Sequence, residues 1–218
     1  MQWHLIKKDA NNFPDKGTYI DWKPQLSLEG NNQCVYCSLH EARFGGERNF
    51  HVEHFRPKSK FPELENDYAN LFFSCSICNI FKGCDWPSEP CDEYNLPAYI
   101  DPSKHDYNLI FDFKNYNLVS KYISPNYMIE RLYLNRPQLI IERRISHLSE
   151  MINNLNDVIP MVIEKYRNVK DDRLRKKIEP NVLELISLLS NSMKLMSDLN
   201  KVKPYKGKDV SRIKRGGA

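Results

Sequence analysis

Residues 51–83, HVEHFRPKSKFPELENDYANLFFSCSICNIFKG, carry most of the chemistry that this chain displays. The stretch opens on His51 and the adjacent pair Glu53 and His54, continues through basic residues and asparagines, and closes on the motif CSIC. A hydrophobic core needs none of these groups, because polar side chains are costly to bury without partners. The stretch therefore indicates a polar site built beside paired thiols.

Two Cys-x-x-Cys pairs give the strongest structural signal, CVYC at Cys34 and Cys37 and CSIC at Cys75 and Cys78. Each pair presents two thiolates on one tight turn, and two such turns supply the four soft ligands that tetrahedral zinc prefers. Paired cysteines in a reducing compartment favour metal over disulfide. We predict one closed structural Zn²⁺ site that stabilises a small, loop-rich domain.

The composition is that of a globular protein, with 218 residues, 41% hydrophobic and 28% charged, and a mild formal charge of +4. The length suits one sizeable domain or two small ones. The polar start, MQWHLIKKDANN, does not resemble a secretory leader, and no apolar run approaches the roughly 18 residues of a membrane span. We expect a cytoplasmic protein that does not enter the membrane.

The chain divides in character near residue 115. Residues 1–115 are rich in cysteine, histidine, proline and aromatic residues, which predicts the zinc-holding domain, whereas residues 116–200 have helical periodicity and no cysteine. Residues 201–218 form a basic tail, either a phosphate-binding segment or a solvated end. The predicted fold class is α+β, a small core followed by a mainly α-helical region.

Two apolar seams, Ile141 to Val162 and Val182 to Met196, predict two amphipathic helices. The charged stretch 167–180 is expected to join them into an antiparallel hairpin, and Pro160 is expected to kink or end the first helix. The seams are expected to bury against each other and the first domain. A docking surface for a partner is the alternative.

The order Cys-x-x-Cys, Glu-His, Asn-Leu, Cys-x-x-Cys-Asn-x-x-Lys resembles HNH endonucleases with a zinc-stapled ββα-metal core. More narrowly, VEHFRPKS (52–59), NLFFSCSICN (70–79) and YIDPSKHDYNLIFDF (99–113) resemble the PtuB-like HNH subunit of Septu and retron-associated anti-phage defence systems. The resemblance covers about residues 30–115 and implies that residues 1–115 form an HNH nuclease domain.

The resemblance also implies roles for individual residues. His54 matches the general base, since a neutral imidazole with a pKa near about 6.5 accepts a proton from water. Glu53 and Asn79 match the ligands of one divalent ion, Mg²⁺ or Mn²⁺, and Asn70 matches the asparagine that ties the loop and orients the base. Adjacent strand residues face opposite sides, so the strand should end or bulge at Glu53 and His54. Otherwise His51 and Glu53 would share a face, and His51 is a candidate accessory ligand or base.

Four basic residues near this site are candidates for phosphate contacts, and the alternative is that each is a solvated surface charge. They are Arg56, Lys58, Lys60 and Lys82.

These motifs predict a metal-dependent HNH endonuclease that cleaves phosphodiester bonds of DNA or RNA as the effector of a defence complex. The alternative is a zinc-stapled nucleic-acid-binding or adaptor subunit without cleavage. The resemblance implies an ABC-type ATPase partner (PtuA-like) and, in retron systems, a reverse transcriptase with its msDNA. The chain has no Gly-rich Lys-Ser/Thr phosphate loop, so a nucleotide switch would have to come from a partner.

Overall fold

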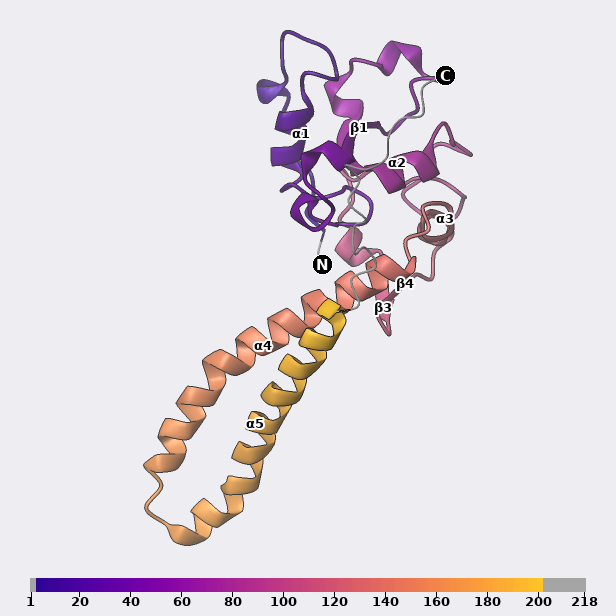
Figure 1. Ribbon diagram of the computed structural model, residues 1–218. Helices are drawn as coiled ribbons and strands as arrows, with labels where there is room; N and C mark the ends of the chain where they lie inside the picture. Colours follow the sequence, from indigo (N-terminus) through magenta and orange to yellow (C-terminus); the bar gives the residue numbers. More distant parts are fainter. Residues whose placement is uncertain (1–2, 202–218) are drawn as a thin grey trace, which may run out of the picture. The chain divides into compact units, whose positions relative to one another are not determined.

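A computed structural model describes residues 3–201, and the chain divides between Glu142 and Arg143 into two compact units (Figure 1). The first unit contains the strands and the short helices, and the second consists of the long helices that follow. Residues 202–218, and with them nearly all of the predicted basic tail, lie outside the described part.

The centre of the first unit is a β-hairpin followed directly by a helix. Strands β1 (Phe50–His54) and β2 (Leu71–Cys75) pair antiparallel from Phe50 opposite Cys75 to His54 opposite Leu71. Aromatic residues favour these strands, and the rings of Phe50 and Phe73 stack with centroids 4.6 Å apart. Helix α2 (Ser76–Lys82) then begins at the second cysteine pair. The predicted ββα core is therefore confirmed.

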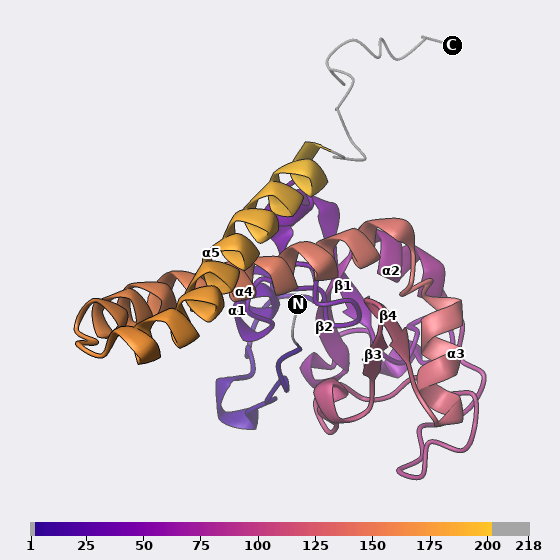
Figure 2. The ribbon, with the colours of Figure 1, turned by 90° about the horizontal axis from the view of Figure 1, so that it is seen from below.

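Other elements of the first unit surround this core. They include helix α1 (Lys23–Glu29) and a second hairpin, β3 (Asp112–Lys114) with β4 (Asn117–Val119), next to helix α3 (Ile123–Arg131) (Figure 2). Asn115 and Tyr116, the two residues of the turn between β3 and β4, have positive φ angles of 51° and 65°, as a type I′ turn requires. Short 3₁₀ turns lie at Ala10–Asn12, Glu41–Arg43, Glu47–Asn49, Pro62–Leu64, Tyr68–Asn70 and Tyr107–Leu109.

The core of the first unit is rich in aromatic side chains, which supply large apolar area in a loop-rich domain. Tyr36, Phe73 and Tyr99 have no exposed surface, and the ring of Trp86 stacks on that of Tyr99. The four paired cysteines belong to the same buried cluster. The cysteine site is thus part of the packing that holds the domain together.

The second unit is built from α4 (Pro137–Arg167), which begins in the first unit, and α5 (Asp172–Lys201). Pro160 and Pro180 lie inside these helices, so Pro160 does not end its helix. The prediction that the whole charged stretch 167–180 is a connection was wrong, because α5 already begins at Asp172. The side chain of Asp171 accepts bonds from the first amides of α5, which is the N-cap signal that marks this start.

The apolar seams of the long helices are only partly buried. In α4 Ile145 and Leu155 are buried, whereas in α5 Ile186 and Met193 are 41% and 54% exposed. The apolar seam of α5 is thus partly buried, and its burial against the first domain stays a prediction. Within residues 3–201, no helix combines the length and the apolar composition that a bilayer crossing requires.

Candidate active site and metal centre

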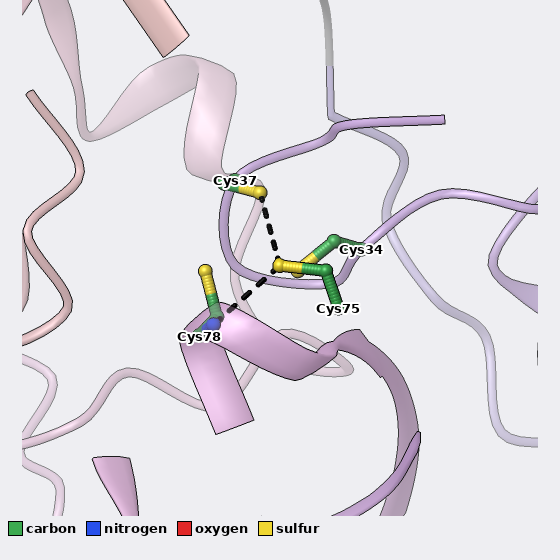
Figure 3. Close-up of side chains that lie close together, drawn as sticks. All are labelled: Cys34, Cys37, Cys75 and Cys78. Atoms are coloured by element: carbon green, nitrogen blue, oxygen red, sulfur yellow. Dashed lines mark hydrogen bonds between the residues drawn. The ribbon is translucent and has the colours of Figure 1, made fainter. Parts of the chain in front are cut away.

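The four paired cysteines converge on one point (Figure 3). All are buried, and the Sγ atoms of Cys34, Cys37, Cys75 and Cys78 lie within 4.8 Å of one another. Cys37 Sγ and Cys75 Sγ are 3.8 Å apart. A tetrahedron with Zn–S bonds of about 2.3 Å has edges of about 3.8 Å. The donor type and the spacing therefore both fit a four-coordinate zinc ion.

The local backbone explains why the two cysteine pairs meet. In the first pair, the Ser38 amide donates to the Cys34 carbonyl at 2.8 Å, and Ser38 adopts a positive φ of 53° that closes the turn. Val35 then donates to the Phe73 carbonyl of β2 at 2.9 Å. In the second pair, Cys75 Sγ accepts from the Cys78 amide and caps α2. Strand β2 therefore ends in Cys75 of the second pair, and its Phe73 carbonyl holds the turn of the first pair.

A hollow of about 350 Å³ is lined in part by residues of β1 and α2. It differs in chemical character from the buried thiol cluster, since several polar and titratable groups line it. Its lining includes Glu53, His54, Lys58 and Asn79, four of the residues predicted from the sequence. Tyr19, from the loop before α1, also lines it.

His54 is held in one orientation at the end of β1. Its Nε2 lies 2.9 Å from the Glu65 backbone carbonyl, and its ring packs edge-on against Tyr19 with centroids 4.8 Å apart. A carbonyl only accepts, so Nε2 carries the proton and Nδ1 of the neutral ring is the acceptor. Burial lowers the pKa of His54, and the charges of Lys58 and Lys82 lower it further, against the opposing effect of Glu65. The neutral form therefore prevails at neutral pH.

Glu53 has a buried partner. It is 2% exposed, and its Oε1 lies 2.6 Å from Nζ of Lys82, which is fully buried. Tyr36 donates to the same oxygen at 3.2 Å, and Lys82 also donates to the His54 carbonyl at 2.8 Å. Burial raises the pKa of Glu53, and the Lys82 ammonium opposes this rise. The ion pair thus connects the end of β1 to α2, and a phosphate contact would require Lys82 to leave it.

The strand is regular up to its end. Glu53 pairs with Phe72 and His54 with Leu71 in unbroken register, and β1 ends at His54. The two side chains accordingly go to different partners, Glu53 to Lys82 and His54 to the Glu65 carbonyl. The structure therefore brings Glu53 and His54 to the same hollow, but it does not direct the two side chains to a common partner.

Asn79 and His51 meet at the outer edge of the same unit. Nδ2 of Asn79, on α2, lies 3.1 Å from Nδ1 of His51, on β1, and His51 is exposed. When the amide nitrogen donates to Nδ1, the neutral ring carries its proton on Nε2, and the amide oxygen of Asn79 is the free ligand group. His51 binds an ion only when this contact is replaced or the ring adopts its other tautomer. An amide oxygen and an imidazole are both donors that divalent ions accept.

Asn70 ties down the loop that follows His54. Its side chain accepts from the Arg56 amide at 2.8 Å and donates to the Arg56 carbonyl at 3.0 Å. The Phe55 amide donates to the Asn70 carbonyl at 2.9 Å. These bonds continue the pairing of the two strands beyond His54 and fix the path of the chain there.

The basic residues predicted for phosphate contacts lie in different surroundings. Lys58 lines the hollow and pairs with Glu65 at 2.8 Å. Arg56 pairs with Glu89 at 2.6 Å, and Lys60 donates to the Trp86 carbonyl at 3.3 Å. Of the four, Lys58 is thus the cation that borders the site.

Sequence reasoning did not identify the residues that hold the predicted ones. Tyr19 and Glu65 carry no local motif, and Tyr36 lies within the CVYC motif, whose spacing does not predict its contact with Glu53. Lys82 had a signal: it follows the buried Cys78 by four residues on a short helix, which places both on one face.

Comparisons with known proteins agree with this geometry. Residues 34–83 match the family model for HNH endonucleases. The chain is 32% identical over 171 residues to the Septu protein PtuB of Bacillus thuringiensis, an alignment that covers 70% of this chain and 62% of the relative. No solved structure matches the chain.

Proposed function

The chain carries a domain of the HNH endonuclease family and is similar to a PtuB protein, and from this premise we propose that it is a metal-dependent endonuclease, the nuclease effector of a Septu-type anti-phage complex. The observation that supports catalysis is the state of His54, a neutral imidazole held at the rim of a polar hollow with Nδ1 as acceptor. A subunit that only binds nucleic acid gains nothing from such a group.

His54 is the general base in this proposal. A water molecule in the hollow would give its proton to Nδ1 as its oxygen bonds to phosphorus, while the Glu65 carbonyl holds the ring through Nε2. The P–O bond to one sugar oxygen breaks, and that oxygen leaves and takes a proton from solvent. Tyr19, packed edge-on against the ring, restricts it further. Lys58, at the border of the hollow, attracts the phosphate of the substrate.

Asn79 and His51 are the groups best suited to hold the Mg²⁺ or Mn²⁺ ion that the family implies, because both lie at the edge of the unit. Such an ion would neutralise charge at the phosphate, and water and phosphate oxygens would complete its ligands. Glu53 fits this role less well, since its carboxylate is buried against an ammonium. We propose that Glu53, with Lys82, supports the strand end that carries His54.

The zinc site has a structural role in this scheme. Cys75 caps α2, and α2 carries both Asn79 and Lys82. Zinc bound by the four thiolates would fix the start of that helix and, through it, the groups that face His54.

The test is to incubate the purified chain, alone and with its defence-complex partner subunits, with single- and double-stranded DNA and RNA in Mg²⁺ or Mn²⁺. His54→Ala should lower the cleavage rate by about 10²–10⁴-fold, the usual contribution of a general base, with zinc content and melting temperature close to wild type. His4→Ala, at an exposed histidine, is the matched control and should cut normally. A fully active His54→Ala variant would remove His54 as the base.

A second role, which can accompany the first, is that of an adaptor that binds an ATPase subunit through α5. The supporting observation is its exposed apolar side chains, Leu183, Ile186 and Met193 among them. An Ile186→Glu/Met193→Glu variant should no longer co-purify with a PtuA-like ATPase, whereas Asn191→Glu, at an exposed polar position, should. Retention of the ATPase by the double variant would exclude α5 as the binding surface. The retron reverse transcriptase stays a prediction.

A further inference from the structure

The cysteine cluster has a fifth member that no motif announces. Arg136, immediately before α4, is 6% exposed, and its guanidinium faces the thiols. NH1 lies 3.7 Å from Cys78 Sγ, and NH2 lies 3.7 Å from Cys37 Sγ and 3.8 Å from Cys75 Sγ. One planar group thus reaches three of the four sulfur atoms.

The surroundings of Arg136 identify the thiolates as its counter-charge. A guanidinium is always protonated, so a buried one requires an anion nearby. Among residues 3–201, no carboxylate forms an ion pair with Arg136. NH1 also donates to the Leu132 and Tyr133 carbonyls at 3.4 Å, but these are neutral. Nε makes no hydrogen bond in the described part of the chain.

The backbone of Arg136 ties this contact to the next helix. Its carbonyl accepts from the amides of Leu139 at 2.9 Å and Ile140 at 3.3 Å, so Arg136 is the N-cap residue that precedes α4. Leu132, Leu134 and Leu139 around it are fully buried. The segment 132–139 is therefore fixed against the rest of the first unit by the packing of these leucines and by the contacts of Arg136 with the cysteines.

We propose that Arg136 is a functional part of the zinc centre: its guanidinium compensates the negative charge of the zinc–thiolate cluster and slows the loss of zinc. A zinc ion with four thiolates carries two negative charges, and burying them without compensation is costly. Hydrogen bonds from the guanidinium spread that charge and make the sulfur atoms weaker bases, which protects them from protons and oxidants. This inference does not depend on nuclease activity. It makes Arg136, which is distant in sequence from both Cys-x-x-Cys pairs, necessary for full zinc affinity.

The experiment uses the zinc-loaded full chain and three variants. Arg136→Met keeps much of the length and removes the charge, Arg136→Lys keeps the charge and loses the planar fork, and Arg131→Met is a control. Arg131 lies on α3 nearby in sequence but pairs with Asp85 at 3.2 Å. Zinc affinity is measured by chelator competition, and zinc release by dilute hydrogen peroxide is followed with a colorimetric indicator.

Arg136→Met should weaken zinc binding by about 10–100-fold, the usual effect of losing a group bonded to metal ligands, and should release zinc faster in peroxide. Arg136→Lys should fall between this variant and wild type, and Arg131→Met should match wild type. In the Co²⁺-substituted protein, loss of the hydrogen bonds should move the sulfur-to-cobalt charge-transfer band to lower energy.

Wild-type zinc affinity, peroxide sensitivity and cobalt spectrum in Arg136→Met would overturn the proposal, even if the melting temperature fell, because Arg136 would then only fill space. Should Arg136→Met fail to fold, Arg136→Lys decides the matter. Faster peroxide release from the lysine variant supports the proposal, and an unchanged rate refutes it.

Discussion

The cysteine centre and the His54 hollow both draw residues from the ββα unit, yet their surroundings are opposite. The cysteines are four identical ligands, all buried, with spacing that suits one closed metal site. The hollow is partly open and lined by different groups, among them His54, Asn79 and Lys58. A closed, uniform site contributes stability, whereas an open, mixed site leaves groups free to react. The ion pair of Glu53 and Lys82 lies between these extremes, because it is buried like the first and polar like the second.

The largest expected effect comes from breaking the closed site. Cys75→Ser removes a zinc ligand and the sulfur that caps α2, and binding of a structural zinc is worth about 10–16 kcal/mol of folding free energy in small domains. The variant should lose its zinc and the cooperative melting of the first unit, as measured by metal analysis and circular dichroism.

The control is Cys84→Ser, at an exposed free cysteine, which should keep both zinc and melting temperature. If Cys75→Ser still held one zinc ion tightly, the four-cysteine assignment would be wrong. That outcome would also remove the contrast between the closed centre and the hollow.

The second prediction decides to which site Glu53 belongs. Glu53→Leu leaves a buried Lys82 ammonium without its partner and should lower the free energy of unfolding by about 3–5 kcal/mol. Glu53→Leu/Lys82→Met replaces the whole pair with apolar groups and should recover most of that loss, because such replacements are often neutral. Urea unfolding at neutral pH measures both.

The opposite result would return Glu53 to the catalytic site. If Glu53 serves mainly as a cation ligand, Glu53→Gln should abolish cleavage at unchanged stability, and the double variant should gain nothing over Glu53→Leu. Cleavage assays of the same proteins in Mg²⁺ and Mn²⁺ separate the two outcomes.

The sequence could predict the parts of this molecule that depend on spacing within a short segment. The cysteine pairs follow from their spacing, whereas the ββα order and the positions of His54 and Asn79 on it follow from the resemblance to HNH endonucleases. The start of α5 also had a local signal in Asp171, which was obscured by the charges around it.

The remaining features depend on contacts between distant segments, which no local pattern encodes. The pairing of Glu53 with Lys82 follows from how α2 packs on β1. Arg136 is an isolated arginine in a helical stretch, and Tyr19 belongs to an N-terminal loop; only the folded chain brings them to Cys78 and His54. The boundary between compact units also depends on such contacts. The change in composition predicts it near residue 115, whereas the units divide between Glu142 and Arg143.

The smallest expected effect concerns pH and tests how open the hollow is. Because the pKa of His54 is lowered, mainly by burial, the active neutral form should persist below the ordinary histidine value of about 6.5. The value of kcat/KM, which reports the free protein, should therefore fall only as pH drops through the lowered pKa, with its midpoint below pH 6.5. The unfolded chain binds this proton more tightly, so the small stability contribution of neutral His54 is also lost as pH falls.

Lys58 supplies the means to move this limit. Its charge lowers the pKa of His54, so Lys58→Gln should shift the acid limb of the rate profile to higher pH, by an amount that shrinks as salt increases. Lys104→Gln, at a surface lysine that pairs with Asp101, should leave the limb in place. An acid limb that already lies above pH 6.5 in the wild-type protein would contradict the lowered pKa of His54. It would mean that water solvates His54 more fully than its burial implies.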